Sequence, residues 1–217
     1  MAEGIASKLA QIRLNASVNE NQIVNFQEPW VLWKMLPQDY DPSLDWSDRL
    51  SPRGRVVSVP DCWRLYNEAY SQENLTRIVS KNDFYLFKEG IKPENKIAPN
   101  TNGGRWRIVL KRNEVTRFHH ILHKLLDMLA TSGFDEGLEG LICGVMATIG
   151  WKSYDNVAIY VWVREIDQSS WLAFRNALEQ NLNVTWADEL HYGRHNKPDD
   201  KKNVSQRTFT RNKNSRN

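Results

Sequence analysis

The stretch EVTRFHHILHKLLDMLAT, residues 114–131, carries the strongest constraint on what this chain can fold into. Its apolar residues recur with the 3.6-residue period of a long amphipathic helix, at Val115, Phe118, Ile121, Leu122, Leu125, Leu126 and Leu129. The segments on either side are short and rich in β-branched and aromatic residues, a composition typical of strands. Strands and helices are therefore interspersed along this chain.

The same patterns predict the remaining elements. Strands are expected at 29–36, 55–59, 82–90, 105–110 and 187–193, and the segments 141–150 and 156–163 are expected to pair as a hairpin. A loop is expected over 39–54, a helix from Ser58 or Asp61 as its cap, and another helix over 167–182, capped by Asp167. Several strands in hairpin reach favour an α+β domain, in which helices cover one face of an antiparallel sheet.

Charge divides the chain into a body and a tail. Residues 193–217 hold eight Lys and Arg against two Asp, a net charge of +6, so the whole-chain charge of +3 leaves −3 on residues 1–192. A basic segment of this kind attracts phosphates. We expect a disordered tail over residues 1–25, one domain over 26–194, and a basic flexible tail over 195–217.

Several classes of protein fit the sequence poorly. Two cysteines, Cys62 and Cys143, do not make a disulfide framework. No apolar run approaches membrane length, and the N-terminus has no signal-peptide core, so we expect a protein of the cytoplasm or the nucleus. His119, His120 and His123 lack the spacing of a metal site and are interpreted as a solvated helix face. The chain has no nucleotide-binding or nucleophile-elbow fingerprint, so we expect neither catalysis nor a cofactor.

An ordered series of motifs carries a family resemblance. Strand WVLW (30–33) is followed by a lone loop indole at Trp46, helix DCWRLYN (61–67), FYLFKEGIKP (84–93) and a loop closed by GGRW (103–106). CGV (143–145) precedes the turn of the predicted hairpin. From about Trp30 to about Tyr192, the chain resembles a divergent member of the eukaryotic translation initiation factor 4E family, which binds the cap of messenger RNA.

That resemblance implies a strongly curved antiparallel sheet with about three helices on its convex face. The concave face of such a protein holds the 7-methylguanosine cap between two loop tryptophans, with a Glu at the guanine edge and basic residues at the phosphates. Because N7 methylation leaves the purine cationic, indole faces attract it by about 0.5–2 kcal/mol each. The expected ligand is capped messenger RNA.

The resemblance also assigns individual residues of the cap site. Trp46 matches the first stacking Trp, whereas the second stacking Trp and its Glu fall at Asn95 and Lys96. Glu94 supplies the carboxylate only if the loop shifts by one or two residues. The phosphate-binding Arg falls near Gly150.

Further cap-site positions fall on the predicted hairpin. Lys152 fits a second basic position, and Asn156 replaces a third. The Trp that touches the methyl group aligns with Tyr160, or with Trp162 if the hairpin carries two extra residues. For both residues, burial in the sheet is the alternative.

A second predicted surface lies on the convex side. Cys62, Leu65, Tyr66 and Ala69 form an inward stripe that leaves Trp63 pointing outward. In the family, Val59, Trp63, and Leu125 or Leu126 would meet a scaffold or inhibitor protein through a Tyr-x4-Leu-hydrophobic helix. The alternative for Trp63 is partial burial by neighbouring side chains. Trp30, Trp33, Trp106 and Trp171 are assigned to the core.

Two other functions stay open on the sequence alone. The cap site is degenerate at Asn95, Lys96 and Gly150, so the chain is alternatively an interaction module that sequesters partners through Trp63. It is also compatible with a general RNA binder that relies on the basic tail.

Overall fold

The computed structural model describes residues 25–35, 46–70, 84–131, 133–149, 156–186 and 188–195. Nearly all of the two predicted tails therefore lies outside the described residues. The elements, in chain order, are β1 (Asn25–Met35), η2 (Trp46–Arg49), β2 (Leu50–Ser58), α2 (Val59–Tyr70), β3 (Phe84–Lys88), β4 (Gly104–Lys111), η4 (Arg112–Glu114), α3 (Val115–Ala130), α4 (Glu136–Glu139), β5 (Ile142–Ile149), β6 (Asn156–Val163), α5 (Gln168–Leu182) and β7 (Leu190–Arg194).

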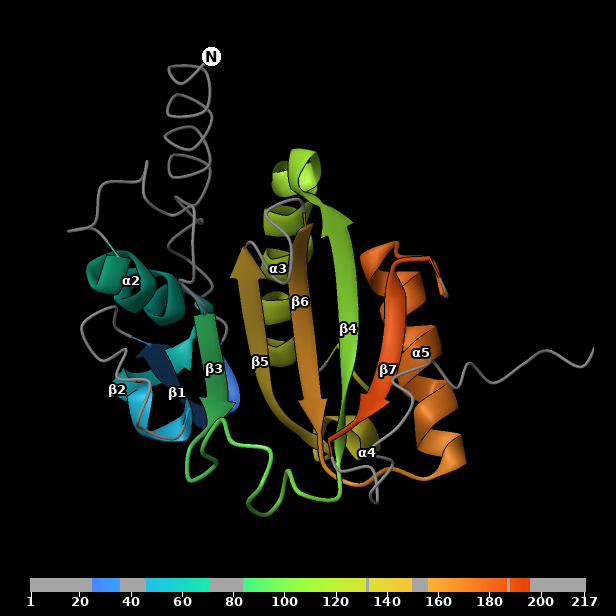
Figure 1. The fold of residues 1–217 in the computed structure, drawn as a ribbon, viewed down its shortest axis with the longest axis horizontal. Helices are drawn as coiled ribbons and strands as arrows, with labels where there is room; N and C mark the ends of the chain where they lie inside the picture. The colour runs from blue at the N-terminus through green and yellow to red at the C-terminus, as the bar shows by residue number, and fades with distance from the viewer. Residues whose placement is uncertain are drawn as a thin grey trace, which may run out of the picture.

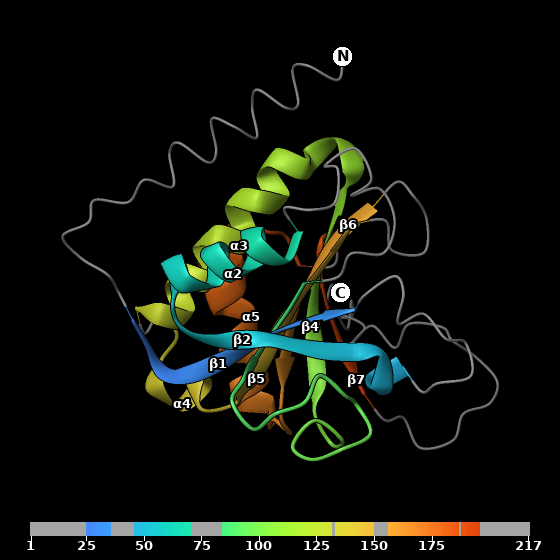
Figure 2. The same ribbon diagram turned by 90° about the vertical axis from the view of Figure 1, so that its left-hand side faces the viewer.

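One seven-stranded sheet organises the domain. Its strands run in the order β2-β1-β3-β5-β6-β4-β7, and every neighbouring pair is antiparallel. The predicted hairpin is present, because β5 pairs with β6 from Ile142↔Val163 to Ile149↔Val157. Figures 1 and 2 show the sheet strongly curved, with helices on one side. The predicted fold class is confirmed.

Three longer helices, α2, α3 and α5, cover the convex face of the sheet, and the one-turn helix α4 packs beside α5. The apolar stripe predicted over 114–131 faces the sheet from α3: Phe118, Ile121, Leu122, Leu125, Leu126 and Leu129 are all buried. Burying a side chain of this size stabilises the fold by about 1.5–3 kcal/mol, so α3 anchors the core.

The two helix caps formed as the sequence predicts. The Asp61 backbone N–H donates to the Ser58 hydroxyl at 3.2 Å at the start of α2. At the start of α5, the Ser170 backbone N–H donates to the Asp167 carboxylate at 2.7 Å. This bond lowers the pKa of Asp167, because it favours the charged carboxylate.

The largest difference between a predicted and an observed strand boundary lies at the start of β2. Residues 46–54 were expected in a loop, but η2 occupies 46–49 and β2 begins at Leu50. The reason is tertiary, because Leu50, Ser51 and Pro52 pair with Met35, Lys34 and Trp33 of β1. A strand partner far along the chain thus extends β2 through residues whose local sequence favours a turn.

Alternation along β4 separates two environments. Trp106, Ile108 and Leu110 face the helices and are buried in the core, so Arg105 and Arg107 face the other side of the sheet. The preceding glycines allow β4 to enter between its neighbours: a Cβ at Gly103 would collide with the Val163 carbonyl, and one at Gly104 with the Tyr192 side chain.

Candidate functional site

The concave face has an aromatic floor. Tyr85 and Phe87 of β3 and Tyr160 and Trp162 of β6 form one apolar cluster, against which Trp33 of β1 packs. The Phe87 and Trp162 rings meet edge to face with their centroids 5.3 Å apart. Tyr160 and Trp162 therefore share a face, as predicted, whereas Trp33 is half-buried on this side and does not join Trp30 and Trp106 in the core beneath the helices.

Basic side chains cover this floor. The Arg105 guanidinium lies 5.2 Å from the centroid of the Tyr160 ring and 5.9 Å from that of Trp162. The His195 ring lies over Trp162 with a centroid distance of 4.2 Å. Tyr160 and Trp162 are consequently only 1% and 3% exposed. Among the described residues, Arg105 and His195 therefore cover the two rings.

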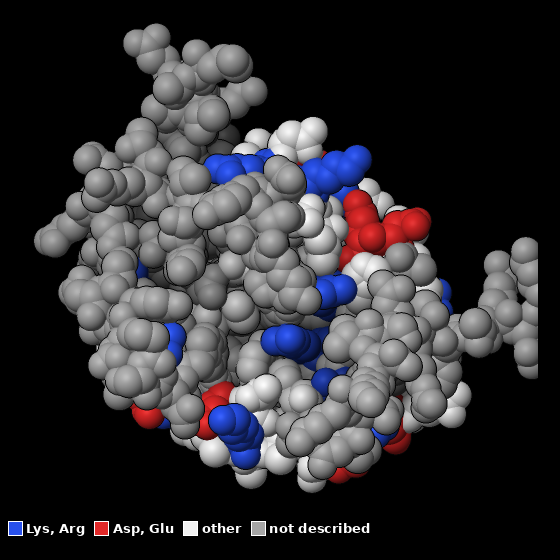
Figure 3. All heavy atoms as spheres, viewed as in Figure 1, with Lys and Arg blue, Asp and Glu red and all other residues white. Residues whose placement is uncertain are grey.

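The strand register extends the basic surface beyond Arg105. Arg107 lies opposite Tyr160 of β6 on one side and His191 of β7 on the other. Figure 3 shows Lys and Arg side chains gathered in the middle of this hollowed face. Sequence reasoning did not assign Arg105 or Arg107 to the site, although their alternation with Trp106 and Ile108 carried the signal.

Burial and like charge shift the titration of this basic cluster. The pKa of Arg105 is lowered first by burial, and Arg107 lowers it further. Burial, together with the charge of Arg105, lowers the pKa of His195 to about 4. The pKa of His191 is lowered by burial and by Arg107, which Asp188 partly opposes. The two histidines are therefore neutral near pH 7, whereas the partly desolvated guanidinium of Arg105 acts strongly on a nearby anion.

The loop 91–103 forms one rim of the concave face, and a buried Asn holds its shape. Asn100 is fully buried, and its side-chain amide donates to the carbonyl oxygens of Lys92 at 3.0 Å and of Glu94 at 2.9 Å. Asn95 and Lys96, at the predicted stacking and carboxylate positions, are exposed to solvent. Glu94 is half-buried, with its carboxylate 3.9 Å from Lys92 Nζ.

An ion pair connects this rim to the segment that carries Trp46. Lys92 Nζ lies 3.7 Å from the Asp48 carboxylate, and Asp48 sits in η2, whose first residue is Trp46. Figure 2 shows η2 beside the loop. The backbone of Trp46 is thus at the same rim as Glu94 and Asn95. The structure does not describe the side chain of Trp46, and Gly150 and Lys152 also lie outside the described residues. Asn156 is described and begins β6.

The predicted partner surface differs from the expectation. Trp63 is half-buried: it packs against the core, and its indole stacks on the His123 ring of α3 with a centroid distance of 5.7 Å and an interplanar angle of 19°. His123 in turn bonds the Asp127 carboxylate at 3.0 Å, which raises the pKa of His123. Partial burial by a neighbour, the alternative for Trp63, is therefore what the structure shows.

The assignment of Leu125 and Leu126 to that surface is wrong. Both side chains are completely buried in the core between α3 and the sheet, out of reach of a docked helix. Because these two residues belong to the inward stripe of α3, the surface beside Trp63 is formed by His123 and Asp127. Val59 begins α2 and is 7% exposed, so it offers little contact area.

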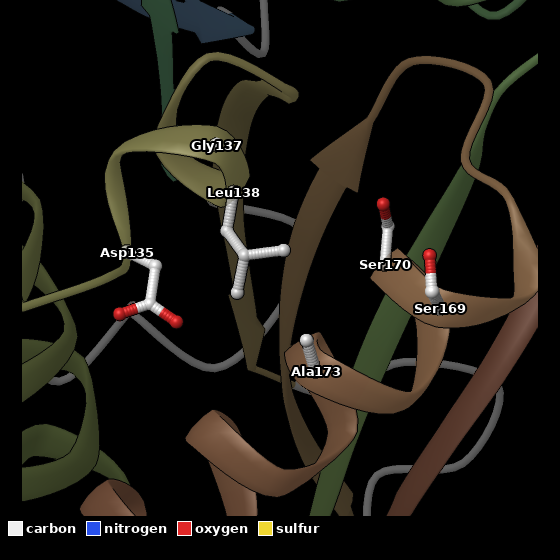
Figure 4. A pocket seen from close by; sticks show the side chains of 6 residues that line it. All are labelled: Asp135, Gly137, Leu138, Ser169, Ser170 and Ala173. Carbon is white, nitrogen blue, oxygen red and sulfur yellow. The ribbon is translucent and has the colours of Figure 1, made fainter.

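A shallow pocket lies between α4 and the first turns of α5 (Figure 4), lined by Asp135, Gly137, Leu138, Ser169, Ser170 and Ala173. It has one carboxylate and no basic residue, unlike the concave face. Within the described ranges, no group of His, Cys, Asp and Glu is arranged to hold a metal, and no helix is long and apolar enough to cross a membrane.

Comparison with known proteins agrees with this architecture. Residues 25–210 match the family described as eukaryotic initiation factor 4E. The chain is 31% identical over 174 residues to eukaryotic translation initiation factor 4E-3 of Caenorhabditis elegans, covering 78% of this chain and 65% of that protein. It is 28% identical over 203 residues to eukaryotic translation initiation factor 4E of Candida albicans, covering 90% and 93%.

Solved structures of similar proteins have the same fold. One similar structure is the complex of the C. elegans factor 4E-3 with the 4E-binding protein Mextli and a cap analog. It superposes with a TM-score of 0.63 at 27% identity, and the match covers 80% of this chain and 94% of that one.

Proposed function

Because this chain belongs to the eukaryotic initiation factor 4E family, we propose that it is a translation initiation factor that binds the 7-methylguanosine cap of messenger RNA on its concave face. The observation that carries the proposal is the position of Arg105 over the rings of Tyr160 and Trp162. A guanidinium held in this position suits the phosphates of a nucleotide, and the indole of Trp46, whose backbone lies at the rim, suits its cationic base. The similar C. elegans protein was solved with a cap analog.

The base would bind at the rim where the two loops meet. Trp46 would stack on the methylated purine, whose positive charge strengthens its attraction to the indole face. Glu94 would accept hydrogen bonds from the guanine edge, and the charge on its carboxylate makes such bonds stronger than neutral ones. The Asp48–Lys92 ion pair supports this arrangement, because it joins the segment of Trp46 to the loop of Glu94.

The phosphates would bind deeper on the same face. Arg105 offers a forked set of N–H donors that suits phosphate oxygens, and His195 lies beside it over Trp162. Lys152, from the β5–β6 connection, would add a second cation. Tyr160 and Trp162 would support these groups from below and contact the ligand where Arg105 moves aside. Asn95 is exposed at the loop and would make only polar contacts with the base.

A partner protein would bind the convex face. The C. elegans structure contains the 4E-binding protein Mextli, and we propose that a scaffold or inhibitor helix docks here on Trp63, flanked by Val59. The stacked His123 leaves one part of the indole accessible, since Trp63 is only half-buried. We further propose that the protein acts by binding and not by catalysis, in the cytoplasm.

Titration with 7-methyl-GTP and with GTP, followed by Trp fluorescence, tests the proposal. The wild type should prefer the methylated nucleotide, and Trp46→Ala should lose about 1–3 kcal/mol of that affinity, the usual range for base stacking. Trp63→Ala is the matched control: it also removes one indole, but from the convex face, and should bind the nucleotide as the wild type does.

Equal affinity of the wild type for the two nucleotides would overturn cap binding. The exposure of Asn95 and Lys96 favours one second candidate in that case, a family member whose cap site has degenerated and which sequesters partners through Trp63. Such a protein would bind a Tyr-x4-Leu-hydrophobic peptide while ignoring 7-methyl-GTP.

A further inference from the structure

The basic surface of the concave face continues past the groups assigned to the cap. Arg107 lies two residues beyond Arg105 on β4 and faces the same side of the sheet. On β7 its partner in the register is His191, so the row Tyr160–Arg107–His191 crosses three strands beside the row Trp162–Arg105–Gly193. These two rows lie side by side, separated by the rise of two strand residues, about 7 Å.

The row that contains Arg105 has an open position, a residue without a side chain, at Gly193. Gly193 lies opposite Arg105, on the same face as His191 and His195, and a Cβ built on Gly193 would meet no atom within 4 Å. The backbone of Gly193 has no positive φ that would require a glycine. No side chain therefore projects from Gly193 into the region bordered by Arg105, Arg107 and His191, and Gly193 is exposed.

The charges around this space favour an anion. Arg105 is close enough to Arg107 for the two like charges to lower the pKa of Arg105, and Arg107 likewise acts on His191. In the described part of the chain, the carboxylate that acts on His191 is Asp188, and no carboxylate is among the groups that shift Arg105. An anion bound beside Arg107 would therefore also be attracted by the guanidinium of Arg105.

We propose that Arg107 and His191, with the open position at Gly193, bind the phosphodiester backbone of the RNA chain that follows the cap. This inference rests on the proposed function, because Arg105 and His195 would hold the cap phosphates next to it. The separation of the two rows is comparable to that of successive phosphates in an extended strand, so an RNA can place one phosphate on each row. The segment that follows His195 in the sequence is also basic, which favours binding to phosphates.

The test compares a ligand that ends at the cap with one that continues. Affinities for 7-methyl-GTP and for a capped oligoribonucleotide of about ten nucleotides are measured over a series of salt concentrations for wild type, Arg107→Gln and Arg107→Lys. The Gln variant should bind the capped oligonucleotide about tenfold more weakly, with a shallower salt dependence, whereas its loss of affinity for 7-methyl-GTP should be several times smaller. The Lys variant keeps the charge and should recover most of the salt dependence.

The control is Arg175→Gln, because Arg175 also lies over an indole, that of Trp186 at 5.0 Å, but belongs to α5 on the convex side. It should leave both affinities as they are. His191→Gln is the second variant, in case Arg107→Gln does not fold, and it should weaken the capped oligonucleotide alone.

Two results would overturn the inference: an unchanged affinity of Arg107→Gln and His191→Gln for the capped oligonucleotide, or an equal loss for 7-methyl-GTP. Failure of the proposed function is recognised separately, when the wild type does not prefer 7-methyl-GTP to GTP. An uncapped 5′-triphosphate oligonucleotide then replaces the capped one. Weaker binding by Arg107→Gln supports the backbone site, and unchanged binding refutes it.

Discussion

Replacing Asn100 by Ala tests how the rim of the concave face keeps its shape. The Asn100 side chain is completely buried and donates two hydrogen bonds, to the carbonyl oxygens of Lys92 and Glu94. Each bond contributes about 1 kcal/mol net. Their removal should lower the free energy of unfolding by about 2 kcal/mol, and loop opening should become roughly thirtyfold easier where it is local.

Urea unfolding and amide hydrogen exchange measure the two parts of this prediction. The backbone N–H groups of Thr101 and Gly103 are bonded within the loop, to the carbonyls of Ile97 and Asn100, so their exchange should accelerate in Asn100→Ala. The affinity for 7-methyl-GTP should fall as well, since Glu94 and Asn95 would no longer be held at the rim. Asn100→Asp should be at least as damaging, because a carboxylate places negative charge against two carbonyl oxygens.

Asn102→Ala provides the matched control. Asn102 lies two residues along the same loop and is exposed, so the same chemical change should alter stability by less than about 0.5 kcal/mol. The reasoning is refuted if Asn100→Ala unfolds at the same urea concentration as Asn102→Ala and exchanges the loop amides at the same rate.

Three other predictions concern the rest of the molecule. Trp63→Ala should cost about 2 kcal/mol or more of affinity for a Tyr-x4-Leu-hydrophobic peptide in calorimetry, and a mutant that binds the peptide normally would place the partner elsewhere. Hydrogen bonds from Arg117 hold the pKa of Glu189 below its ordinary value, so this pair stabilises the fold fully above the ordinary Glu pKa and loses its contribution as the pH falls through the lowered one. Thermal melts of Glu189→Gln should therefore show a weaker loss of stability than the wild type below about pH 5, and parallel curves would contradict this. Deleting residues 196–217, which hold seven Lys and Arg against two Asp, should flatten the salt dependence for capped RNA without changing 7-methyl-GTP affinity, whereas an equal loss for both would assign the tail to the cap pocket.

Local pattern was sufficient for most of the fold. The helical period of α3, the capping residues Ser58 and Asp167, and the hairpin of β5 and β6 were all predicted correctly. The period and the caps depend on residues within a few positions of one another, and the hairpin joins two strands that are consecutive in the sequence. The start of β2 was not predicted, because the residues around Pro52 are typical of a turn. They form a strand because they pair with β1, and the local sequence does not show that pairing.

The error at Leu125 and Leu126 has a different origin. Both residues were counted in the inward stripe of α3 and also assigned to the partner surface, two roles that one side chain cannot fill. The stripe alone gave the correct side, since the structure buries both completely. His123, which contacts Trp63, and Asp127, which bonds His123, lie off this stripe. The periodicity of α3 by itself therefore separates the residues on the side of Trp63 from those in the core.

The sequence by itself determined the family, the α+β layers and the inward face of α3, because these follow from motif order and from the 3.6-residue period of a helix. Only the tertiary structure decided what lies on the concave face. Arg105, Tyr160 and His195 come from separate elements, and their contacts exist because β6, β4 and β7 are neighbours in the sheet. The open position at Gly193 and the two hydrogen bonds of the Asn100 side chain likewise cannot be read from the sequence. Strand order and register bring together residues that are tens of positions apart, and no local pattern encodes which strands will meet.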